Sequence, residues 1–414
     1  MAVIRPFKAI RPAKALAEEV ISLPYDVMNR SEAKEMCCDK PHNFLHICRS
    51  EIDLSDDCDP YSKEVYQKAK SNIQDFLQKG VFVEENAPCI YIYRQIMNGR
   101  VQTGIAACTS IDDYQNNIIK KHEFTRHEKE LDRINHFDVC NANTEPVFLT
   151  YRNNDTINDI ISDWIEQHEP EYDIVSEDQT QHIIWVLDDS EIIQNICRCF
   201  DNINALYIAD GHHRSASAVK VGLKRREENP NYTGIEQFNY FLAVIFPDRD
   251  LRIFDYNRVV RDLNGLSSTE FVEKIKDKFI VTPMDSPDPY RPEAPHTFGM
   301  YLDNKWFKLE AKKDIIADDT IKGLDVSILQ DHLLNPVLGI EDPRKDKRID
   351  FVGGIRGLKE LEKRVHSDMT VAFCLYPVSI EQLLAVSDKD LVMPPKSTWF
   401  EPKLGSGLFI HKLL

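Results

Sequence analysis

The sequence lacks the patterns by which several common classes of protein are recognised. Its ten cysteines form no C-x-x-C pair, so the usual signatures of zinc ribbons and thioredoxin-type sites are absent. It has no Walker A loop, no kinase glycine-rich loop and no G-x-G-x-x-G, and the standard nucleotide folds are therefore not supported. Tandem repeats are absent as well.

Positive charge and long apolar runs are also scarce. Asp and Glu number 68 against 51 Lys and Arg, a formal net charge of −17, which argues against a general nucleic-acid or anionic-membrane binder but leaves room for a local basic pocket. No apolar run approaches the ~20 residues of a membrane span, and the first residues lack the core of a signal peptide. We expect a cytoplasmic protein, with no membrane partner, whose thiols are mostly buried or inert and form no disulfides.

The chain is long enough for two or three domains. Apolar and polar runs alternate as strands and helices do, which predicts a mixed α/β (α+β) protein whose sheet is covered at least partly on both faces. Residues 89–109 around Asn98-Gly99 predict a β-hairpin with a type I′ turn, and 43–47 a strand. We expect an α/β region at 1–115, a core at 116–265 and a second α/β region at 266–414.

The most informative stretch is residues 205–218. Five apolar residues predict a strand, Asp210-Gly211 a turn, and the alanine-rich run that follows a helix. Such a turn directs the amide groups and positive dipole end of the new helix at a space where an anion is favoured. Arg214 adds a fork for phosphate or carboxylate. His212 and His213 could donate hydrogen bonds or move protons, and Asp210 could orient a histidine, hold Mg²⁺ or act as a base. The alternative is an ordinary Asp-Gly turn with structural histidines.

A second stretch, residues 118–133, concentrates charge. In a helix, Glu123 and His127 would share a face, as would His122 and Arg126. The spacing is not His-Glu-x-x-His, so this is no zincin motif. The segment is either a solvated charged helix or a polar segment that supplies a base and phosphate-binding groups.

The third stretch is the proline-bounded tail at 393–407. Lys396, Ser397 and Thr398 stand in an extended segment, and a lysine beside hydroxyls suits a phosphate. The alternative is an ordered tail that covers a core edge with Trp399 and Phe400.

Four motifs together resemble the domain of unknown function 1015 family. They are Lys121–Arg126, Glu145–Tyr151, Ile208–Arg214 and Met393–Thr398. That family is similar to the ParB/sulfiredoxin-like superfamily, in which a Gly-x-x-Arg turn at a helix N-terminus binds nucleotide phosphates, and Gly211-His-His-Arg214 matches that turn. The superfamily includes kinases that phosphorylate free serine.

The resemblance implies a ParB/sulfiredoxin-like core with a strand-turn-helix phosphate site and flanking α/β regions. It also implies ATP or ADP with Mg²⁺, and serine as a candidate acceptor. On this reading the protein is a phosphotransferase acting on a small hydroxylated metabolite, with free L-serine first among the candidates. A homo-oligomer is left open.

Roles in such a site follow from the chemistry of the residues. Gly211, His212, His213 and Arg214 would hold phosphates, with His213 also a catalytic candidate. Asp210 or Glu123 would serve as Mg²⁺ ligand or base. The transferred group or a substrate carboxylate would be met by His122, Arg126 and Lys396, with Ser397 and Thr398 beside the last.

Two rivals remain open. One is a ParB-like nucleotide-responsive regulator without turnover, which would be expected to carry a basic helix-turn-helix if it bound DNA; none is found. The other is a sulfiredoxin-like reductase, which would need a cysteine in the Gly-x-x-Arg turn, where this chain has histidines.

Overall fold

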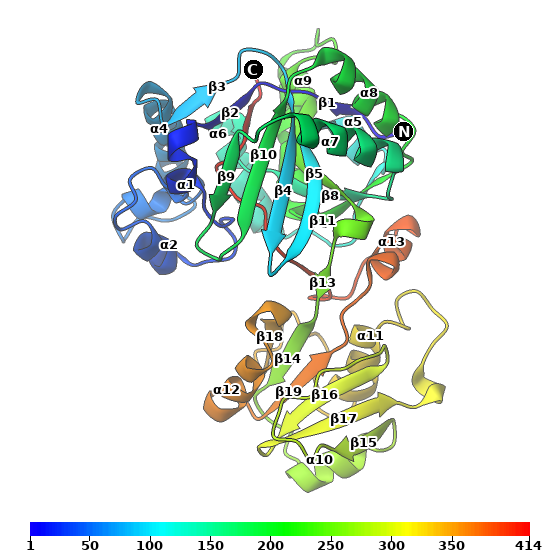
Figure 1. Ribbon diagram of the computed structural model, residues 1–414. Helices are drawn as coiled ribbons and strands as arrows, with labels where there is room; N and C mark the ends of the chain where they lie inside the picture. Colours follow the sequence, from blue (N-terminus) through cyan, green and yellow to red (C-terminus); the bar gives the residue numbers. More distant parts are fainter. The chain divides into compact units, whose positions relative to one another are not determined.

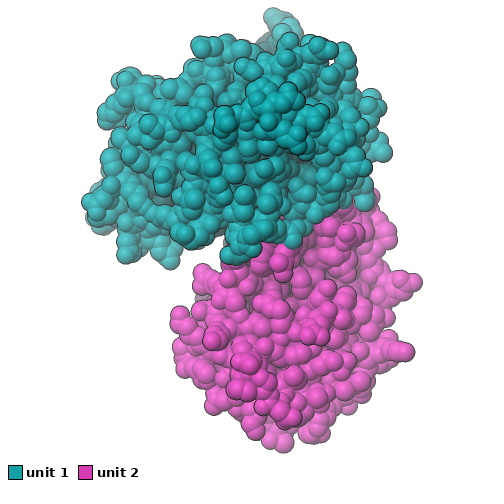
Figure 2. Space-filling view, viewed as in Figure 1, with its two compact units in different colours: residues 1–251, 402–414 teal, residues 252–401 magenta.

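The computed structural model describes residues 1–414 and divides into two compact units (Figure 2). Unit 1 comprises Met1–Leu251 and Pro402–Leu414, and unit 2 comprises Arg252–Glu401. The chain therefore leaves unit 1 once and returns to it for its last residues, so both ends of the chain lie in unit 1 (Figure 1). None of the helices combines the length and apolar character that crossing a bilayer requires.

Unit 1 is built on a nine-stranded sheet. Neighbouring strands follow the order β6, β11, β8, β12, β5, β4, β10, β9, and β1 pairs with β5 beside this path. Most pairs are antiparallel, whereas β11 is parallel to β6 and β12 is parallel to β8. The strands are β1 (Ile4–Arg5), β4 (Ile90–Met97), β5 (Arg100–Ser110), β6 (Ile119–Lys120), β8 (Val147–Tyr151), β9 (Tyr172–Val175), β10 (Gln181–Leu187), β11 (Leu206–Asp210) and β12 (Tyr240–Pro247).

Both faces of this sheet are buried. Strand β12 is buried along its whole length, and because side chains alternate along a strand, Phe241, Ala243 and Ile245 share one face. They join an apolar core to which helices contribute. On the other face the rings of Tyr91 and Tyr93 lie 5.1 and 6.1 Å from that of Phe409 in the C-terminal segment. The helices of the first face are α5 (Ile111–Gln115), α7 (Asp155–Gln167), α8 (Ser190–Phe200) and α9 (His212–Glu228).

A four-stranded sheet completes unit 1, in the order β3, β2, β21, β7. It has its own apolar core, which includes Phe44, Phe76 and Phe82. The strand predicted at 43–47 is wrong, because Leu45–Cys48 forms a short helix. The elements are β2 (Ala9–Pro12), β3 (Phe82–Glu84), β7 (Ala142–Asn143), β21 (Ile410–Lys412), α1 (Ala17–Val20), α2 (Arg30–Met36), α3 (Leu45–Cys48), α4 (Lys63–Gln78) and α6 (His127–Cys140).

Unit 2 contains a six-stranded antiparallel sheet in the order β15, β17, β16, β19, β14, β18, and a separate two-stranded pair, β13 with β20. Its core includes Val259, Trp306 and Leu361. The elements are β13 (Ile253–Phe254), β14 (Tyr256–Val260), β15 (Phe279–Pro283), β16 (Thr297–Leu302), β17 (Lys305–Ala311), β18 (Ile349–Gly353), β19 (Val371–Leu375), β20 (Trp399–Phe400), α10 (Ser268–Ile275), α11 (Asp325–Leu329), α12 (Lys359–Ser367) and α13 (Ile380–Asp388).

The hairpin predicted at 89–109 is confirmed. Strands β4 and β5 pair antiparallel over Tyr91–Met97 and Arg100–Ala106. Asn98 and Gly99 have φ angles of 52° and 76°, as a type I′ turn requires at both central positions. The mixed α/β class is likewise confirmed by the two sheets of unit 1, the sheets of unit 2 and the helices packed on them.

The two units do not follow the regional boundaries expected after residues 115 and 265. Strands β12 and β5 stand on either side of the first boundary, yet they pair over six consecutive positions. Strand β14 precedes the second boundary and is paired within the sheet of unit 2. The division of the chain into two units depends on pairing between strands that are far apart in the sequence. The composition along the chain does not reveal these pairings.

Candidate functional site

The predicted strand-turn-helix is present at the end of β11. The strand ends at Asp210, Gly211 is the N-cap with φ 94° and ψ 32°, and α9 begins at His212. Only glycine adopts this left-handed conformation without steric cost. Because Gly211 has no side chain, no side-chain cap closes the first turn of α9. The amide groups and positive dipole end of a 17-residue helix therefore begin here.

Arg214 lies beneath this turn and not in solvent. It is 2% exposed, and its Nη1 donates a hydrogen bond to the carbonyl of Pro146 at 2.7 Å. Its Nη2 lies 3.8 Å from Oδ2 of Asp210. Its Nε is buried and has no hydrogen-bond partner. Burial by itself would lower the pKa of Arg214, but the carboxylates of Asp26, Asp210 and Glu145 raise it, so the guanidinium is charged.

Asp210 is held as a carboxylate. Burial favours its neutral form, but Lys403 and Arg214 outweigh that effect and lower the pKa of Asp210. Nζ of Lys403 lies 3.3 Å from Oδ2, and the amide of Gly211 donates to Oδ1 at 2.8 Å. An ionised carboxylate with a low pKa suits a metal or an ion pair better than it suits proton abstraction near neutral pH.

His122 and His212 form a buried pair. Their rings meet edge to face with centroids 4.4 Å apart, and the amide of His122 donates to Nε2 of His212 at 3.5 Å. Nδ1 of His212 lies 3.7 Å from the exposed carboxylate of Glu123. Burial lowers the pKa of His122 to about 4 and that of His212 well below its usual range. Both rings are neutral near pH 7, so they offer hydrogen bonds but no positive charge.

His213 is half-buried and links the turn to the second predicted stretch. Its Nε2 accepts a hydrogen bond from the amide of Arg126 at 3.0 Å, which fixes that nitrogen as the unprotonated one. Burial lowers the pKa of His213, with the carboxylate of Asp26 opposing. The guanidinium of Arg126 is exposed beside it.

The second stretch is a loop followed by a helix. Helix α6 begins at His127, and its N-cap, Arg126, has an extended conformation. Glu123 therefore lies outside the helix and does not share a helical face with His127, as a helix over residues 118–133 would require. Residues 121–126 follow the first turn of α9 instead, because His122, Glu123 and Arg126 each contact one of its histidines.

Beside the turn lies a buried charged cluster: Arg133, Glu145 and Arg214. Oε1 of Glu145 accepts from the hydroxyl of Ser406 at 2.8 Å. Its Oε2 lies 3.8 Å from Nη1 of Arg133, and neither atom has a hydrogen-bond partner. The guanidinium of Arg133 lies 4.0 Å from the ring centroid of Tyr25. Burial raises the pKa of Glu145, and the two arginines oppose that shift.

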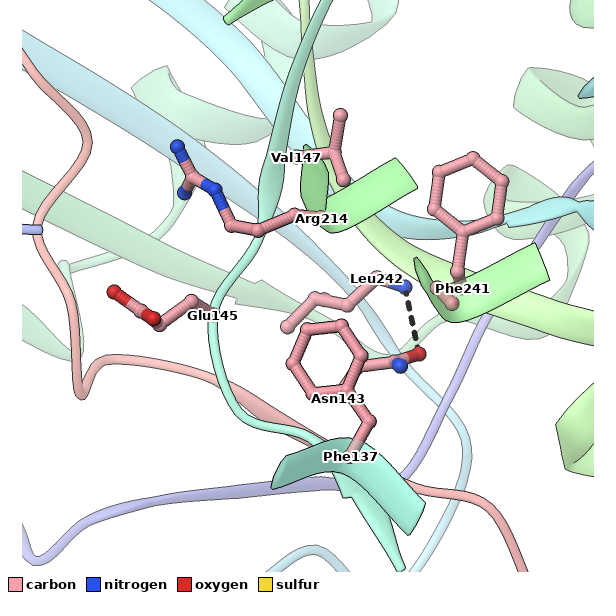
Figure 3. A pocket seen from close by; sticks show the side chains of 8 residues that line it. Phe137, Asn143, Glu145, Val147, Arg214, Phe241 and Leu242 are labelled. Carbon is pink, nitrogen blue, oxygen red and sulfur yellow. Dashed lines mark hydrogen bonds between the residues drawn. The ribbon is translucent and has the colours of Figure 1, made fainter. Parts of the chain in front are cut away.

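Figure 3 shows how this cluster adjoins the apolar core. The guanidinium of Arg214 and the carboxylate of Glu145 point away from Phe137 and Phe241. The side chains pack closely, and no space among them is large enough for a water molecule. The remaining residues that pack here are Asn143, Val147, Ala218 and Leu242.

The candidate residues of the third predicted stretch, Lys396, Ser397 and Thr398, belong to unit 2, whereas the stretch from Pro402 onward belongs to unit 1. Lys396 is exposed and in the left-handed conformation, with φ 56° and its Nζ 5.4 Å from the ring centroid of Tyr256. The hydroxyl of Ser397 donates to the carbonyl of Pro394. Thr398 is partly buried. A role for Lys396, Ser397 and Thr398 beside Asp210 stays a prediction.

Sequence reasoning missed several residues that the fold brings to the turn. Lys403 and Ser406 lie in the tail, a few positions beyond the predicted site residue Lys396. Asp26 is exposed, and its carboxylate acts on both Arg214 and His213. The available signals were a second lysine in the tail, Lys403, and the turn-forming sequence Pro24-Tyr25-Asp26. No group of three His, Cys, Asp or Glu side chains is arranged to hold a metal, and all ten cysteines are free thiols.

Comparisons with known proteins add a family and distant likenesses. None of the curated proteins matches the sequence. A free serine kinase in complex with AMP is 14% identical, the match covering 76% of this chain and 95% of that one, with a TM-score of 0.35. A conserved hypothetical protein from Pyrococcus furiosus is also 14% identical, over 75% and 97%, with a TM-score of 0.34. SbnI with C-terminal truncation from Staphylococcus aureus is 12% identical, over 74% and 87%, with a TM-score of 0.38. At these scores the likenesses say nothing of what this chain binds.

The family comparison is more extensive. The model of the family described as "Protein of unknown function (DUF1015)" matches residues 4–327. This range holds nearly all of unit 1, including the turn at Asp210–Arg214, and the first part of unit 2. Since it covers well over half of the sequence and includes three of the four motifs that suggested it, the chain belongs to the DUF1015 family.

Proposed function

We propose that this protein is a nucleotide-dependent phosphotransferase whose acceptor is a small hydroxylated metabolite. The observation that carries the proposal is the start of α9. There an uncapped helix N-terminus, the ionised Asp210 and the cations of Lys403 and Arg214 meet within one turn. Amide groups at a helix N-terminus and fixed cations are what phosphate oxygens bind, and phosphoryl transfer depends mainly on positioning and charge neutralisation.

In this proposal Gly211 lets the chain enter α9 in the left-handed conformation without a side-chain cap, and the free amides of the first turn bind the phosphates. His212 and His213 donate or accept hydrogen bonds as neutral rings. The exposed guanidinium of Arg126, held beside His213, supplies a mobile positive charge for the transferred group. Arg214 is buried, so its main contributions are to stabilise the conformation of the turn and to add positive charge beside it.

Asp210 fits an Mg²⁺ ligand better than a base. Mg²⁺ keeps several waters and commonly uses only one or two carboxylates with substrate phosphates, so it needs no larger cluster. When bound there the ion would neutralise phosphate charge. The candidate bases are the exposed carboxylates of Glu123 and Asp26, and His213 once the amide of Arg126 releases its Nε2. His122 is buried behind His212 and would orient that ring.

Free L-serine is the first acceptor to test, because the family resemblance implies it. The nucleotide is ATP or ADP. Lys396, Ser397 and Thr398 would join the site only if the tail of unit 2 supplies them, and this part of the proposal can be tested separately by Lys396→Ala.

The experiment is incubation of the purified protein with ATP or ADP, Mg²⁺ and a pool of hydroxylated metabolites that includes serine. Mass spectrometry then searches for a new phosphoester. We expect phosphoserine, and we expect Arg126→Ala and His213→Ala to reduce its formation at least about tenfold. Arg126 is exposed and His213 is only half-buried, so their replacement should leave the protein folded.

The matched control is His42→Ala, since His42 is a partly exposed histidine of unit 1 that pairs with Glu19. It should retain full activity. If nucleotide binds but no phosphoester forms with any acceptor, the phosphotransferase proposal fails and a nucleotide-responsive regulator without turnover takes its place. Equal losses in His42→Ala and His213→Ala would show that the measurement reports stability.

A further inference from the structure

Lys403 is held in place from several sides. It is the second residue of the segment Pro402–Leu414 that returns to unit 1. Its carbonyl accepts a hydrogen bond from Nε2 of the buried Gln95 at 2.8 Å. Two positions on, the amide of Gly405 donates to the hydroxyl of Tyr93 at 3.1 Å, and Ser406 bonds to Glu145. These contacts fix the backbone, so the side chain of Lys403 reaches the start of α9 from a rigid support.

Two cationic side chains meet the carboxylate of Asp210 at the start of α9. The cations of Lys403 and Arg214 share one oxygen, Oδ2 of Asp210, at 3.3 and 3.8 Å. Their side chains are 13% and 3% exposed, so solvent screens them poorly. The positive dipole end of α9 adds to the same field. The carboxylates of Asp26 and Glu145 also act on Arg214, but the uncapped helix N-terminus and Lys403 would stabilise a phosphate anion beside Asp210.

An unpartnered donor points to the same anion. Nε of Arg214 is buried without a hydrogen-bond partner. A Cβ built on Gly211 would lie 3.1 Å from it, so this N–H lies directly against the turn. A buried donor left without an acceptor is costly, and Gly211 places no side chain between this donor and the turn. The turn thus offers donors from both the arginine and the helix, with Lys403 beside them.

We propose that Lys403 is a direct ligand of the nucleotide's phosphate groups. The inference rests on the proposed function and names a residue outside the motif that suggested it. In the free protein the ammonium of Lys403 pairs with Asp210. In the complex it turns to a phosphate oxygen, and Asp210 is released to the Mg²⁺ that accompanies the phosphates. The phosphate-binding lysine of the tail is then Lys403, whereas the sequence pattern predicted Lys396.

Binding of ATP, ADP and inorganic tripolyphosphate, each with Mg²⁺, tests this by calorimetry. We expect Lys403→Met to raise the Kd of all three about tenfold or more, because a charge-assisted hydrogen bond is lost. Lys403→Arg keeps the charge and should remain within about threefold of wild type. The matched control is Lys412→Met, in the same C-terminal segment, where Lys412 pairs with the exposed Glu84. It should bind like wild type.

A second measurement needs no variant. Saturating Mg²⁺ and ATP should slow acetylation of Lys403 by an amine-reactive reagent, read by peptide mass spectrometry, while acetylation of Lys412 stays unchanged. A lysine that only neutralises Asp210 would become more reactive, because the metal competes for its partner.

The outcomes separate this inference from the proposed function. If wild type binds nucleotide and Lys403→Met binds it equally well, the inference is overturned and the proposed function stands. If Asp210→Asn combined with Lys403→Met restores both stability and affinity, Lys403 acts only as the partner of Asp210, which also overturns it. Absence of any binding to wild type overturns both.

Discussion

The carboxylate of Glu145 accepts a hydrogen bond from the hydroxyl of Ser406 at 2.8 Å, across 261 positions of sequence. The same side chain is 1% exposed and faces two buried arginines, Arg133 and Arg214. Glu145 therefore joins the returning C-terminal segment to the cluster of charges beneath the turn. Its loss would remove the carboxylate that both arginines share and leave Arg133 with Asp132 and Arg214 with Asp210.

We expect Glu145→Ala to reduce the free energy of unfolding by about 3–5 kcal/mol, the usual cost of removing one member of a buried ion pair. Ser406→Ala should cost less, about 1–3 kcal/mol, because it removes one hydrogen bond to a charged group. Chemical denaturation measures both. The exposed pair provides the control: Glu84→Ala should change stability by less than about 1 kcal/mol. Equal losses at positions 84 and 145 would contradict the argument.

Gly211→Ala tests the turn itself. Alanine would have to adopt φ 94°, and its Cβ would lie 3.1 Å from Nε of Arg214. Gly80 offers a matched comparison, because it has φ 70° with nothing within 4 Å of the added atom. Gly80→Ala should cost about 1 kcal/mol for the left-handed backbone alone.

Gly211→Ala should lose more stability than Gly80→Ala, because its Cβ also contacts Arg214. Nucleotide affinity should fall in Gly211→Ala and stay unchanged in Gly80→Ala. Equilibrium denaturation and calorimetry give the two values. If the two alanine variants lose the same stability and bind nucleotide equally, the close approach at Gly211 has no consequence.

The free energy of unfolding should fall as the pH is lowered from 6.5 to about 5.5, because buried histidines resist protonation in the folded protein. Burial lowers the pKa of His122 and that of His182 to about 4. Below pH 6.5 the unfolded chain takes up protons that the folded protein does not, so stability is fully present above pH 6.5 and declines as the pH falls toward 4. Each pKa unit of depression corresponds to about 1.4 kcal/mol.

Denaturation midpoints at pH 7.5, 6.5 and 5.5 measure this slope. His182→Gln should flatten it, whatever its effect on the absolute stability. The partly exposed His42 is the comparison, and His42→Gln should leave the slope as in wild type. A slope that His182→Gln does not change would show that other groups control the acid response.

Thiol reactivity should follow burial. Cys38 is exposed, whereas Cys48, Cys108 and Cys374 are buried with pKa values raised well above the usual range by desolvation. A thiol reagent such as DTNB should label Cys38 rapidly in the native protein and these three only on unfolding. Labelling followed by peptide mass spectrometry gives the order. Rapid reaction of Cys108 in the folded state would contradict the burial of β5.

Local features could be predicted well from the sequence. The apolar run before Asp210, the Asp-Gly turn and the alanine-rich helix depend on preferences within a few residues, and they form β11, Gly211 and α9 as expected. The hairpin around Asn98-Gly99 depends on two φ angles and is equally local. Residues 121–126 were harder, because their pattern also suits a helix, and contacts with the histidines of α9 hold them in a loop.

By itself the sequence determined the local chemistry of the turn: an acid, two imidazoles and a guanidinium around a glycine that opens a helix. The family followed from the motifs as well. Only the tertiary structure decided that Arg214 is buried, that His122 is neutral, and that Lys403, Ser406 and Glu145 gather around the turn. Backbone preferences act over a few residues and can be read locally. Burial and the return of a distant segment depend on strand pairings far apart in the chain, so they arise only when the whole sheet forms.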